Sequence, residues 1–372
     1  MKFFVSCGEV SGDMHASALV RELKNFFPEA TFQGIGGDFL RNEGVDVVLD
    51  VNEMGIIGFF EALKSIPRVN QQLQLAYRYA SDADFCIFVD YPGFNLRLAK
   101  KTHKLGKKNI YYILPQVWAW GRWRAKQLKE NFDLLISIIP FEKDFYKSLG
   151  IDVYFCGSPV YDRYLTEKAT LTRISVPAGK KIIGILPGSR EHEVKSLLPY
   201  LENIIRKLNR RRNDLFFVIS QKTDFQMTPM ENVLVYDGSQ YSIMSISDVL
   251  IVASGTATLE TALFEKPMIV IYKTSQLTYI IGKILARIRN ISLVNLILGE
   301  EVVPEFVQKI DENLIRDKIL DFLEDETLYF ATVEKLKKLK EVLKPGAANN
   351  AARIIFEEVI RNGHAGTDPK PA

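Results

Sequence analysis

The chain has 372 residues, of which 47% are hydrophobic and 25% are charged, and its formal net charge at pH 7 is +3. This length allows two domains with separate cores, and the composition is that of a globular protein. The small net charge gives no general argument for nucleic-acid binding, and the sequence contains no run of 18 apolar residues suited to spanning a membrane.

The cysteines and histidines form no pattern that indicates a bound metal. Cys7, Cys86 and Cys156 are far apart, and two of them lie in apolar, strand-like runs, which favours buried thiols in a reducing compartment. The histidines lack metal-ligand spacing, so we expect no metal and no cofactor. Because the amino terminus runs directly into a strand and a helix, no signal peptide is expected, and the predicted location is the cytoplasm.

Short apolar runs alternate with helical patterns along the whole chain. Continuous apolar strands separated by helices of about 10–15 residues indicate parallel sheets that are covered on both faces. The fold class is therefore α/β, with a doubly wound, Rossmann-like sheet in each half. The expected strands are 2–7, 31–34, 46–49, 85–90, 109–113, 134–138, 153–156, 181–186, 215–219, 233–236, 249–252 and 268–272.

The stretch 161–181 is polar and lacks a strong period, so it predicts a linker region. We assign 1–165 to a first Rossmann-like domain and 176–345 to a second. The remainder is expected to form a C-terminal helix over 346–362, with packing against the first domain as one option, and a disordered tail over 363–372. In such sheets ligands sit beyond the carboxyl ends of the strands, so the strand-end loops are expected to carry the chemistry.

The first strand-end loop, GEVSGD, has the layout of a nucleotide-binding turn but not its charge. Glu9 and Asp13 place two carboxylates where a phosphate would sit. The next glycine-rich stretch, GIGGDFL, has Phe39 where a dinucleotide motif needs its third glycine, so we reject that motif.

The segment 54–67 is apolar around more than one helical stripe. It predicts either a buried core helix or an exposed patch that contacts lipid, with Lys64 and Arg68 at the headgroups. The apolar side chains that would make this membrane contact are Ile56, Ile57, Phe59, Phe60 and Leu63.

Asp90 ends the apolar run FCIFVD. An acid at the carboxyl end of a buried strand is placed for general-base chemistry. The following YPGFN turns the chain and brings Asn95 close to the start of the next helix. The alternative interpretation is that Asp90 only caps this turn.

The stretch ILPGSREHEV predicts a strand that turns into a helix through Gly188, Ser189 and Arg190. Gly188 lets the backbone approach a ligand, Ser189 offers a hydroxyl, and Arg190 offers a planar fork of donors suited to phosphate. The partial positive charge of the helix amino terminus adds to this attraction. A simple turn with an exposed arginine is the alternative.

A second anion cradle is predicted where the strand 249–252 turns into a helix. Small residues at a helix start present backbone N–H groups to an anion, and here they are Ser254, Gly255, Thr256 and Ala257. Glu260 follows one turn later, where its carboxylate could accept hydrogen bonds from a pair of ribose hydroxyls. Its alternative role is in a capping box.

Taken together, these pieces resemble the lipid-A-disaccharide synthase family. They keep the family order over about 300 residues, and the combination is far more specific than any single motif. The matching pieces are GEVSGD (8–13), MGIIGF (54–59), VDYPGFN (89–95), QVWAWGRWR (116–124), FEKDFY (141–146), LPGSREHEV (186–194), ASGTATLE (253–260) and SLVNLILGEEVVPEFVQ (292–308).

The resemblance implies a GT-B architecture, with two Rossmann-like domains and an interdomain cleft. It implies an inverting, metal-independent hexosyltransferase of lipid A biosynthesis at the inner face of the inner membrane. This family joins UDP-2,3-diacylglucosamine to 2,3-diacylglucosamine 1-phosphate (lipid X), which gives a β-1,6-linked disaccharide and UDP. Another GT-B enzyme acting on UDP-N-acetylglucosamine, such as an epimerase or a lipid-linked sugar transferase, is the alternative. We expect peripheral contact with an anionic membrane and no nucleic-acid partner. The sequence predicts no particular oligomeric state.

The resemblance also implies roles for single residues. Asp90 matches the essential acid, as general base or to orient the acceptor, and Arg190 matches the essential arginine that neutralises UDP. Glu260 would hold the ribose, and Asn295 matches a donor-site position. On the acceptor side, the residues expected near the sugar are Glu9, Ser11, Gly12, Asp13 and Asn95, with a helix cap as the alternative for Asp13. The segment 54–66 matches the membrane-contact region.

Overall fold

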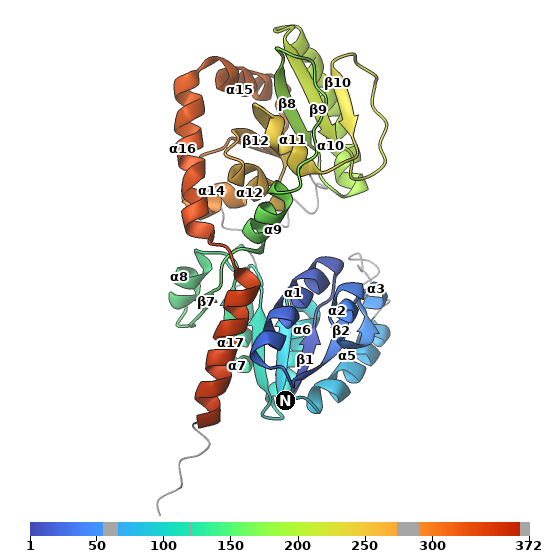
Figure 1. The fold of residues 1–372 in the computed structure, drawn as a ribbon, viewed down its shortest axis with the longest axis vertical. Helices are drawn as coiled ribbons and strands as arrows, with labels where there is room; N and C mark the ends of the chain where they lie inside the picture. Colours follow the sequence, from blue (N-terminus) through green and yellow to red (C-terminus); the bar gives the residue numbers. More distant parts are fainter. Residues whose placement is uncertain (55–65, 120, 122, 274–289, 365–372) are drawn as a thin grey trace, which may run out of the picture. The chain divides into compact units, whose positions relative to one another are not determined.

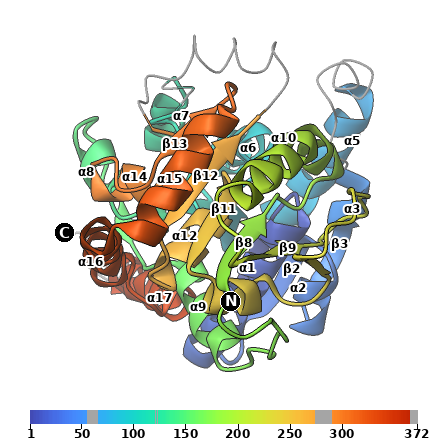
Figure 2. The same ribbon diagram turned by 90° about the horizontal axis from the view of Figure 1, so that it is seen from above.

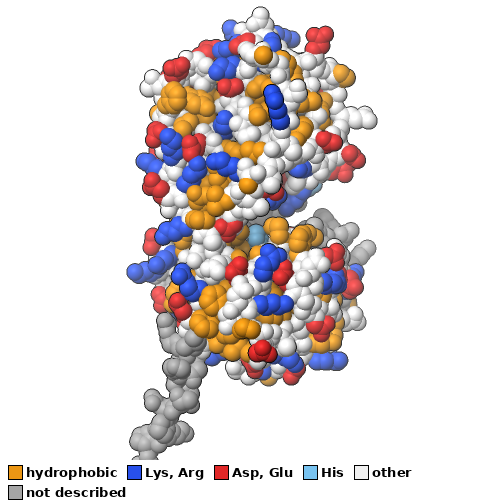
Figure 3. All heavy atoms as spheres, in the orientation of Figure 1, with side chains coloured by type: hydrophobic (Ala, Val, Ile, Leu, Met, Phe, Trp, Pro, Cys, Tyr) orange, Lys and Arg blue, Asp and Glu red, His pale blue; other side chains and the backbone are white. Residues whose placement is uncertain are grey.

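The computed structural model of the chain describes residues 1–54, 66–119, 121, 123–273 and 290–364 (Figure 1). The chain divides into two compact units. Unit 1 comprises Met1–Pro159 together with Pro345–Ala372, and unit 2 comprises Val160–Lys344. On the face shown in Figure 3, acidic and basic side chains are interspersed over each unit, in keeping with the small net charge of +3.

The described part of unit 1 contains a seven-stranded parallel sheet with the strand order β3-β2-β1-β4-β5-β6-β7. The order reverses at β1, whose neighbours are β2 and β4. The strands are β1 (Lys2–Ser6), β2 (Thr31–Gly36), β3 (Asp46–Asp50), β4 (Phe85–Val89), β5 (Lys108–Tyr112), β6 (Leu134–Ser137) and β7 (Tyr154–Phe155).

Helices cover both faces of this sheet. Successive residues of a strand point to opposite faces, so Phe3 and Val5 pack under α1 and α17, whereas Phe4 packs under α5 and α6. The described helices of unit 1 are α1 (Val10–Phe26), α2 (Asp38–Asn42), α3 (Val51–Met54), α5 (Ile66–Ser81), α6 (Pro92–His103), α7 (Arg124–Asn131), α8 (Glu142–Lys147) and α17 (Ala347–His364).

The C-terminal helix α17 lies against α1, far from it in sequence (Figure 1). The ring of Phe356 packs on Phe26 and Phe27 at centroid distances of 5.1 and 5.4 Å. Asn350 Nδ2 donates to the Cys156 carbonyl at 2.9 Å, at the end of β7. The helix therefore completes the core on one face of the unit 1 sheet. Of the predicted tail 363–372, residues 365–372 lie outside the described part of the chain.

The described part of unit 2 repeats the arrangement with a six-stranded parallel sheet in the order β10-β9-β8-β11-β12-β13. Here the order reverses at β8, whose neighbours are β9 and β11. The strands are β8 (Lys181–Leu186), β9 (Leu215–Ser220), β10 (Val233–Tyr236), β11 (Val249–Ala253), β12 (Met268–Tyr272) and β13 (Glu305–Val307).

Two cores flank this second sheet, and Figure 2 shows helices on both sides of its strands. Ile183 and Ile185 of β8 belong to the core under α10 and α15, whereas Leu250 and Val252 of β11 belong to the core under α12 and α16. The described helices are α9 (Pro159–Lys168), α10 (Glu191–Asn209), α11 (Gln240–Ile246), α12 (Thr256–Leu263), α14 (Leu293–Leu298), α15 (Glu312–Glu324) and α16 (Glu326–Leu343).

The predicted α/β class with two doubly wound domains is confirmed, and each expected strand lies within two residues of an observed one. The strand β13 was not predicted, because it has three residues and all are only half-buried. The helix α9 was not predicted either; it occupies part of the expected linker 161–181 because Tyr164 anchors it in the unit 2 core. The three cysteines are buried, as expected, and no described helix has the length and apolarity needed to cross a membrane.

The loop after β2 is filled by a side chain from α1. The buried carboxylate of Asp13 accepts hydrogen bonds from the backbone N–H groups of Gly37 at 2.8 Å, Phe39 at 3.0 Å and Leu40 at 3.3 Å. A Cβ at Gly37 would lie 2.7 Å from Asp13 Oδ2, so the glycine is what permits this approach. Asp13 thus occupies backbone N–H groups at the start of α2 that would otherwise be open to an anion.

We predict that Asp13→Ala destabilises unit 1, because it leaves three buried backbone donors without their acceptor. The expected loss in free energy of unfolding is about 3 kcal/mol, measured by urea denaturation. Asp38→Ala is the matched control, since Asp38 is an exposed acid of the same loop whose ion pair with Arg41 is also exposed; we expect less than about 0.5 kcal/mol there. Equal losses in both variants would contradict the structural role of Asp13.

Candidate active site

The turn after β4 holds Asp90 in a strained conformation. Asp90 and Tyr91 have φ values of 48° and 49°, in the left-handed region that residues other than glycine rarely adopt. The Asp90 carbonyl is fixed by two donors, the Tyr111 hydroxyl at 2.8 Å and Asn95 Nδ2 at 2.7 Å. This geometry fixes the half-buried Asp90 at the carboxyl end of the sheet.

The first strand-end loop contacts this turn, because β1 and β4 are neighbours. A Cβ at Gly8 would lie 2.1 Å from the ring of Tyr91, so the ring packs directly on the glycine backbone. Glu9 is exposed beside it, as the N-cap residue of α1. The structure therefore brings Glu9 and Asp90, two residues predicted from separate motifs, to one edge of the sheet.

The electrostatic surroundings make Asp90 a stronger base than an exposed aspartate. Burial raises the pKa of Asp90, the negative charge of Glu9 raises it further, and a hydrogen bond from the Tyr91 backbone acts in the opposite direction. A carboxylate with a raised pKa accepts a proton more readily near neutral pH. These properties suit the predicted general base.

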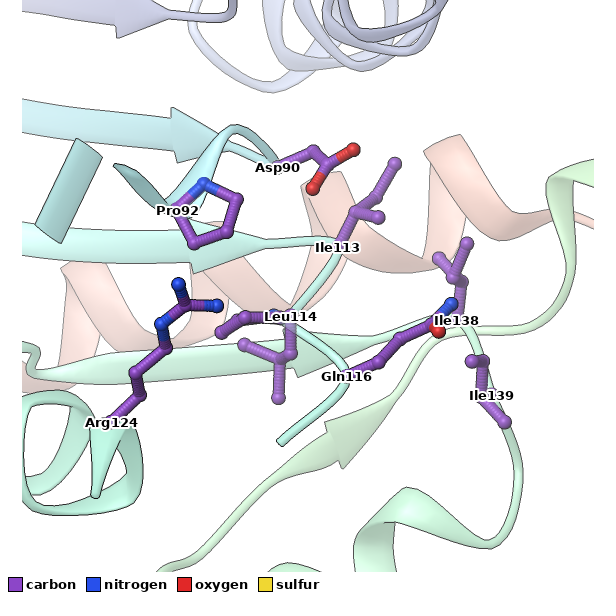
Figure 4. Close-up of a pocket in the computed structure, with 9 residues that line it drawn as sticks. Asp90, Pro92, Ile113, Leu114, Gln116, Arg124, Ile138 and Ile139 are labelled. Atoms are coloured by element: carbon purple, nitrogen blue, oxygen red, sulfur yellow. The ribbon is translucent and has the colours of Figure 1, made fainter. Parts of the chain in front are cut away.

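A pocket of about 220 Å³ opens beside Asp90. It lies at the carboxyl ends of β4, β5 and β6, and Figure 4 shows Asp90 and Arg124 at different sides of it. One wall residue, Ile113, has a φ of 64°, which is strained for a β-branched residue. The lining residues are Asp90, Pro92, Ile113, Leu114, Pro115, Gln116, Arg124, Ile138 and Ile139.

Behind the pocket wall lies a buried acid, Glu142. Its Oε1 accepts from Trp118 Nε1 at 2.8 Å, and its Oε2 contacts the Ser137 hydroxyl. That hydroxyl is also 3.0 Å from the Ile139 carbonyl and accepts from the Ile139 N–H at 2.9 Å. A hydroxyl carries one proton, so Ser137 shares its proton between Glu142 Oε2 and the Ile139 carbonyl. Burial raises the pKa of Glu142 to about 7, and the hydrogen bonds from Ser137 and Trp118 act in the opposite direction.

In unit 2, the loops after the neighbouring strands β8 and β11 lie side by side. A Cβ at Gly188 would be 3.7 Å from Ala253 Cβ, and the φ of Gly188 is 111°. Ser189 is exposed, and Arg190 is the N-cap residue of α10. The exposed Arg190 guanidinium forms an ion pair with Glu193 at 3.0 Å. The predicted phosphate-binding groups are thus accessible at a helix start.

The other predicted cradle begins α12. Gly255 is its N-cap residue, Gly255 and Thr256 are exposed, and Ser254 and Ala257 are half-buried. The capping-box alternative for Glu260 is wrong, because this buried carboxylate accepts from the Tyr241 hydroxyl at 2.8 Å and from Gln240 Nε2 at 2.6 Å. Burial raises the pKa of Glu260. A role of Glu260 toward ribose stays a prediction.

Three residues predicted as ligand contacts are instead buried and hydrogen-bonded inside the protein. Asp13 holds the β2 loop, as described above. Asn95 is fully buried: its Nδ2 also donates to the carbonyls of Ser6 at 3.2 Å and Val89 at 3.3 Å, and its Oδ1 accepts from Ser6 Oγ at 2.7 Å. Neither side chain has a free face for a ligand, so Asn95 positions the Asp90 turn.

Asn295 is the third correction. It is fully buried, and its Nδ2 donates to the Val303 carbonyl at 2.8 Å and to Glu305 Oε1 at 2.7 Å. Its Oδ1 accepts from the backbone N–H groups of Val302 at 2.8 Å and Val303 at 3.0 Å. All four hydrogen-bonding positions of the amide are used, so Asn295 ties together the chain before β13.

Of the remaining predicted residues, some are described by the structure and others lie outside the described part of the chain. Ser11 is exposed in the first turn of α1, whereas Gly12 is buried, and a Cβ there would be 3.2 Å from Cys7 Cβ, which indicates a packing role. The predicted membrane contacts Ile56, Ile57, Phe59, Phe60 and Leu63 lie outside the described residues. Among the described residues, no group of three or more His, Cys, Asp or Glu side chains could hold a metal ion.

Sequence reasoning missed the residues that line the Asp90 pocket, including Gln116 and Arg124, and the buried Glu142. All three lie in pieces quoted for the family resemblance, QVWAWGRWR and FEKDFY. Their position after β5 and β6 was the available signal, because these strands end beside β4 in a doubly wound sheet.

The described elements define a protein of two doubly wound, Rossmann-like units. Solved structures with this fold include a UDP-N-acetylglucosamine 2-epimerase from Neisseria meningitidis bound to UDP-GlcNAc, with a TM-score of 0.65 and 15% identity, covering 97% of this chain and 100% of that one. A glycosyltransferase of kitacinnamycin matches with a TM-score of 0.63 and 14% identity, covering 96% and 97%. At these identities the likeness shows the fold alone.

Sequence relatives identify the family. A family model described as lipid-A-disaccharide synthetase matches residues 3–358. Lipid-A-disaccharide synthase of Sulfurihydrogenibium sp. (strain YO3AOP1) is 38% identical, covering 98% of this chain and 100% of that protein. That of Persephonella marina is also 38% identical, covering 96% and 98%. The chain belongs to the lipid-A-disaccharide synthase family, so the predicted resemblance is confirmed.

We predict that Glu142→Gln flattens the pH dependence of stability. The folded state raises the pKa of Glu142 to about 7, so its contribution is fully present below the unfolded pKa of about 4.3 and is lost as pH rises through 7. A glutamine does not ionise, so its contribution to stability does not change over this pH range.

Relative to wild type, the Glu142→Gln variant should therefore be about equally stable at pH 4 and more stable at pH 8 by up to about 3 kcal/mol. Urea denaturation at each pH measures this difference. Glu130→Gln on α7 is the control, because Glu130 is exposed. A wild-type-minus-variant difference that stays constant from pH 4 to 8 would show that folding does not raise the pKa of Glu142.

Proposed function

We propose that this chain transfers 2,3-diacylglucosamine from UDP to the 6-hydroxyl of 2,3-diacylglucosamine 1-phosphate, giving a β-1,6-linked disaccharide and UDP. The observation that carries the proposal is the family match over residues 3–358, combined with Asp90 at the carboxyl edge of the unit 1 sheet. Asp90 is suited to accept a proton from a hydroxyl, because its pKa is raised and its turn is held in place.

In the proposed reaction, the Asp90 carboxylate accepts the proton of the acceptor 6-hydroxyl. The freed oxygen forms a bond to C1 of the donor sugar while the bond from C1 to the UDP oxygen breaks. Attack from the face opposite the leaving group converts the α linkage into a β linkage. Asn95 and Tyr111, which hold the Asp90 carbonyl, keep the base in place.

Unit 2 supplies the charge that the leaving group needs. The departing UDP oxygen gains negative charge in the transition state, and fixed donors aimed at it lower the barrier. Arg190 is exposed at the start of α10, and a diphosphate can replace its exposed ion pair with Glu193. Gly255, Thr256 and Ala257 at the start of α12 add backbone N–H groups, and Ser254 adds its hydroxyl, since its own N–H donates to the Ile271 carbonyl at 2.9 Å.

The test is an assay with both acylated sugars, in which the products are resolved by mass. Wild type should release UDP and form the disaccharide only when both sugars are present. Hydrolysis or epimerisation of UDP-N-acetylglucosamine without an acylated acceptor would instead favour the alternative GT-B enzyme. Binding of UDP with no turnover at high enzyme concentration would indicate a non-catalytic binding protein.

We predict that Asp90→Asn lowers turnover by a factor on the order of 10²–10⁴, because the general base is lost. Its stability at pH 7 should equal or exceed that of wild type: the raised pKa means that the ionised Asp90 costs folding free energy above its unfolded pKa. Steady-state rates and thermal unfolding measure the two effects. Wild-type turnover in a folded Asp90→Asn variant would refute the catalytic assignment.

We also propose that the enzyme works at an anionic membrane surface on the cytoplasmic side, since both substrates carry acyl chains. The sequence of 54–66 supports this, because it is apolar around more than one helical stripe and has Lys64 and Arg68 beside it.

The triple change Ile57→Ser, Phe59→Ser and Phe60→Ser should release the protein from vesicles that contain anionic lipid, without unfolding it. Flotation measures binding, and circular dichroism measures folding. The control pair is Leu328→Ser with Phe330→Ser on α16, which are also exposed apolar residues and should leave vesicle binding unchanged. If the triple variant unfolds, 54–66 is a core helix.

A further inference from the structure

The Asp90 pocket contains one side chain of each charge. Among the described residues that line it, Arg124 is the cation and Asp90 the anion, and the others are apolar apart from Gln116. In Figure 4, Arg124 reaches from α7 toward Leu114 and Pro92, while Asp90 enters from the end of β4. The pocket therefore presents a base and an anion-binding group to one small ligand.

The size of the pocket restricts that ligand. Its volume is about 220 Å³, below the range of about 300–1,000 Å³ that is usual for larger ligands. A single sugar ring with its substituents suits this space, whereas acyl chains do not. Ile113, Leu114 and Ile138 line the pocket with apolar side chains, beside which a charged substituent interacts with Arg124 more strongly than in open water.

The position and geometry of Arg124 suit it to bind a phosphate. It is half-buried as the first residue of α7, where the helix dipole adds partial positive charge. Its guanidinium carbon lies 5.2 Å from the centroid of the Trp123 ring, which helps to fix its direction. A planar guanidinium can donate two parallel hydrogen bonds to a phosphate.

The chemistry of the acceptor connects the two charged residues. In a hexose 1-phosphate, the carbon that carries the phosphate and the carbon that carries the hydroxymethyl group are both bonded to the ring oxygen. The 6-hydroxyl and the phosphate therefore project from the same edge of the ring, separated by that oxygen. If Asp90 meets the 6-hydroxyl, the phosphate lies within the same small pocket.

We propose that Arg124 binds the anomeric phosphate of the acceptor and so selects a sugar 1-phosphate over the unphosphorylated sugar. This inference rests on the proposed function, in which Asp90 faces the acceptor hydroxyl. Arg124 is then the residue that sets acceptor specificity, and it orients the ring so that the 6-hydroxyl meets the base.

The experiment compares two acceptors, 2,3-diacylglucosamine 1-phosphate and the same sugar without phosphate, at saturating donor. Arg124→Ala should raise KM for the phosphorylated acceptor by roughly 10- to 100-fold, as expected for a lost charge-assisted hydrogen bond, and should change KM for the other acceptor less than about twofold. Arg124→Lys keeps the charge but lacks the planar fork, so an intermediate effect is expected. KM for the UDP donor should not change.

The matched control is Lys126→Ala, which removes a positive charge from the same helix at an exposed position outside the pocket. It should leave both acceptors unaffected. An equal loss on both acceptors in Arg124→Ala, or an equal effect of Lys126→Ala, would overturn the proposal. If Arg124→Ala fails to fold, the acceptor selectivity of Arg124→Lys and Arg124→Gln decides the question in the same way.

A binding measurement separates failure of this inference from failure of the proposed function. Glucosamine 1-phosphate should raise the Tm of wild type more than glucosamine does, and this difference should vanish in Arg124→Ala. Wild type without any disaccharide product but with this Arg124-dependent shift would refute the proposed reaction and keep the phosphate site. If wild type forms the disaccharide but shows no such Tm difference, and Arg124→Ala keeps the acceptor selectivity of wild type, the proposed reaction stands and the phosphate site is refuted.

Discussion

The reversal of strand order in each sheet is the constraint on which the candidate site residues of each unit depend. In unit 1, α1 follows β1 and packs on one face, whereas α6 follows β4 and packs on the other. In unit 2, α10 and α12 diverge in the same way from β8 and β11. In each sheet, the segments that follow the two adjacent strands turn toward opposite faces, so the space above the strand ends stays open. Asp90 and Arg190 lie at these two places.

The open position in unit 1 is maintained at a cost in backbone strain. Asp90, Tyr91 and Ile113 all have positive φ values, which cost about 1–3 kcal/mol each. The compensation is found directly beneath them, where Asn95 and Tyr111 hold the Asp90 carbonyl and the ring of Tyr91 packs on Gly8. A polar residue after a strand-end turn can therefore hold the turn itself and make no contact with a ligand.

This distinction explains how far the sequence could predict the structure. Apolar runs specify strands of a parallel sheet, and strand ends specify where side chains gather, so the fold and the location of Asp90 were predictable. Whether a polar side chain points outward or inward depends on partners far away in sequence. Asp13 faces amide groups of another loop, and Asn295 faces the chain before β13. Nothing local separates these two from Glu9, which is exposed.

The two acids near the pocket illustrate why a raised pKa does not identify a catalytic group by itself. Burial raises the pKa of both Asp90 and Glu142. Glu142 is enclosed by Trp118 and Ser137, which use its two oxygens and leave no route to a ligand. Asp90 is half-buried, lines the pocket, and is influenced by an exposed charge on Glu9. Access and geometry, not the size of the shift, are the grounds on which we propose proton transfer for Asp90 and a structural role for Glu142.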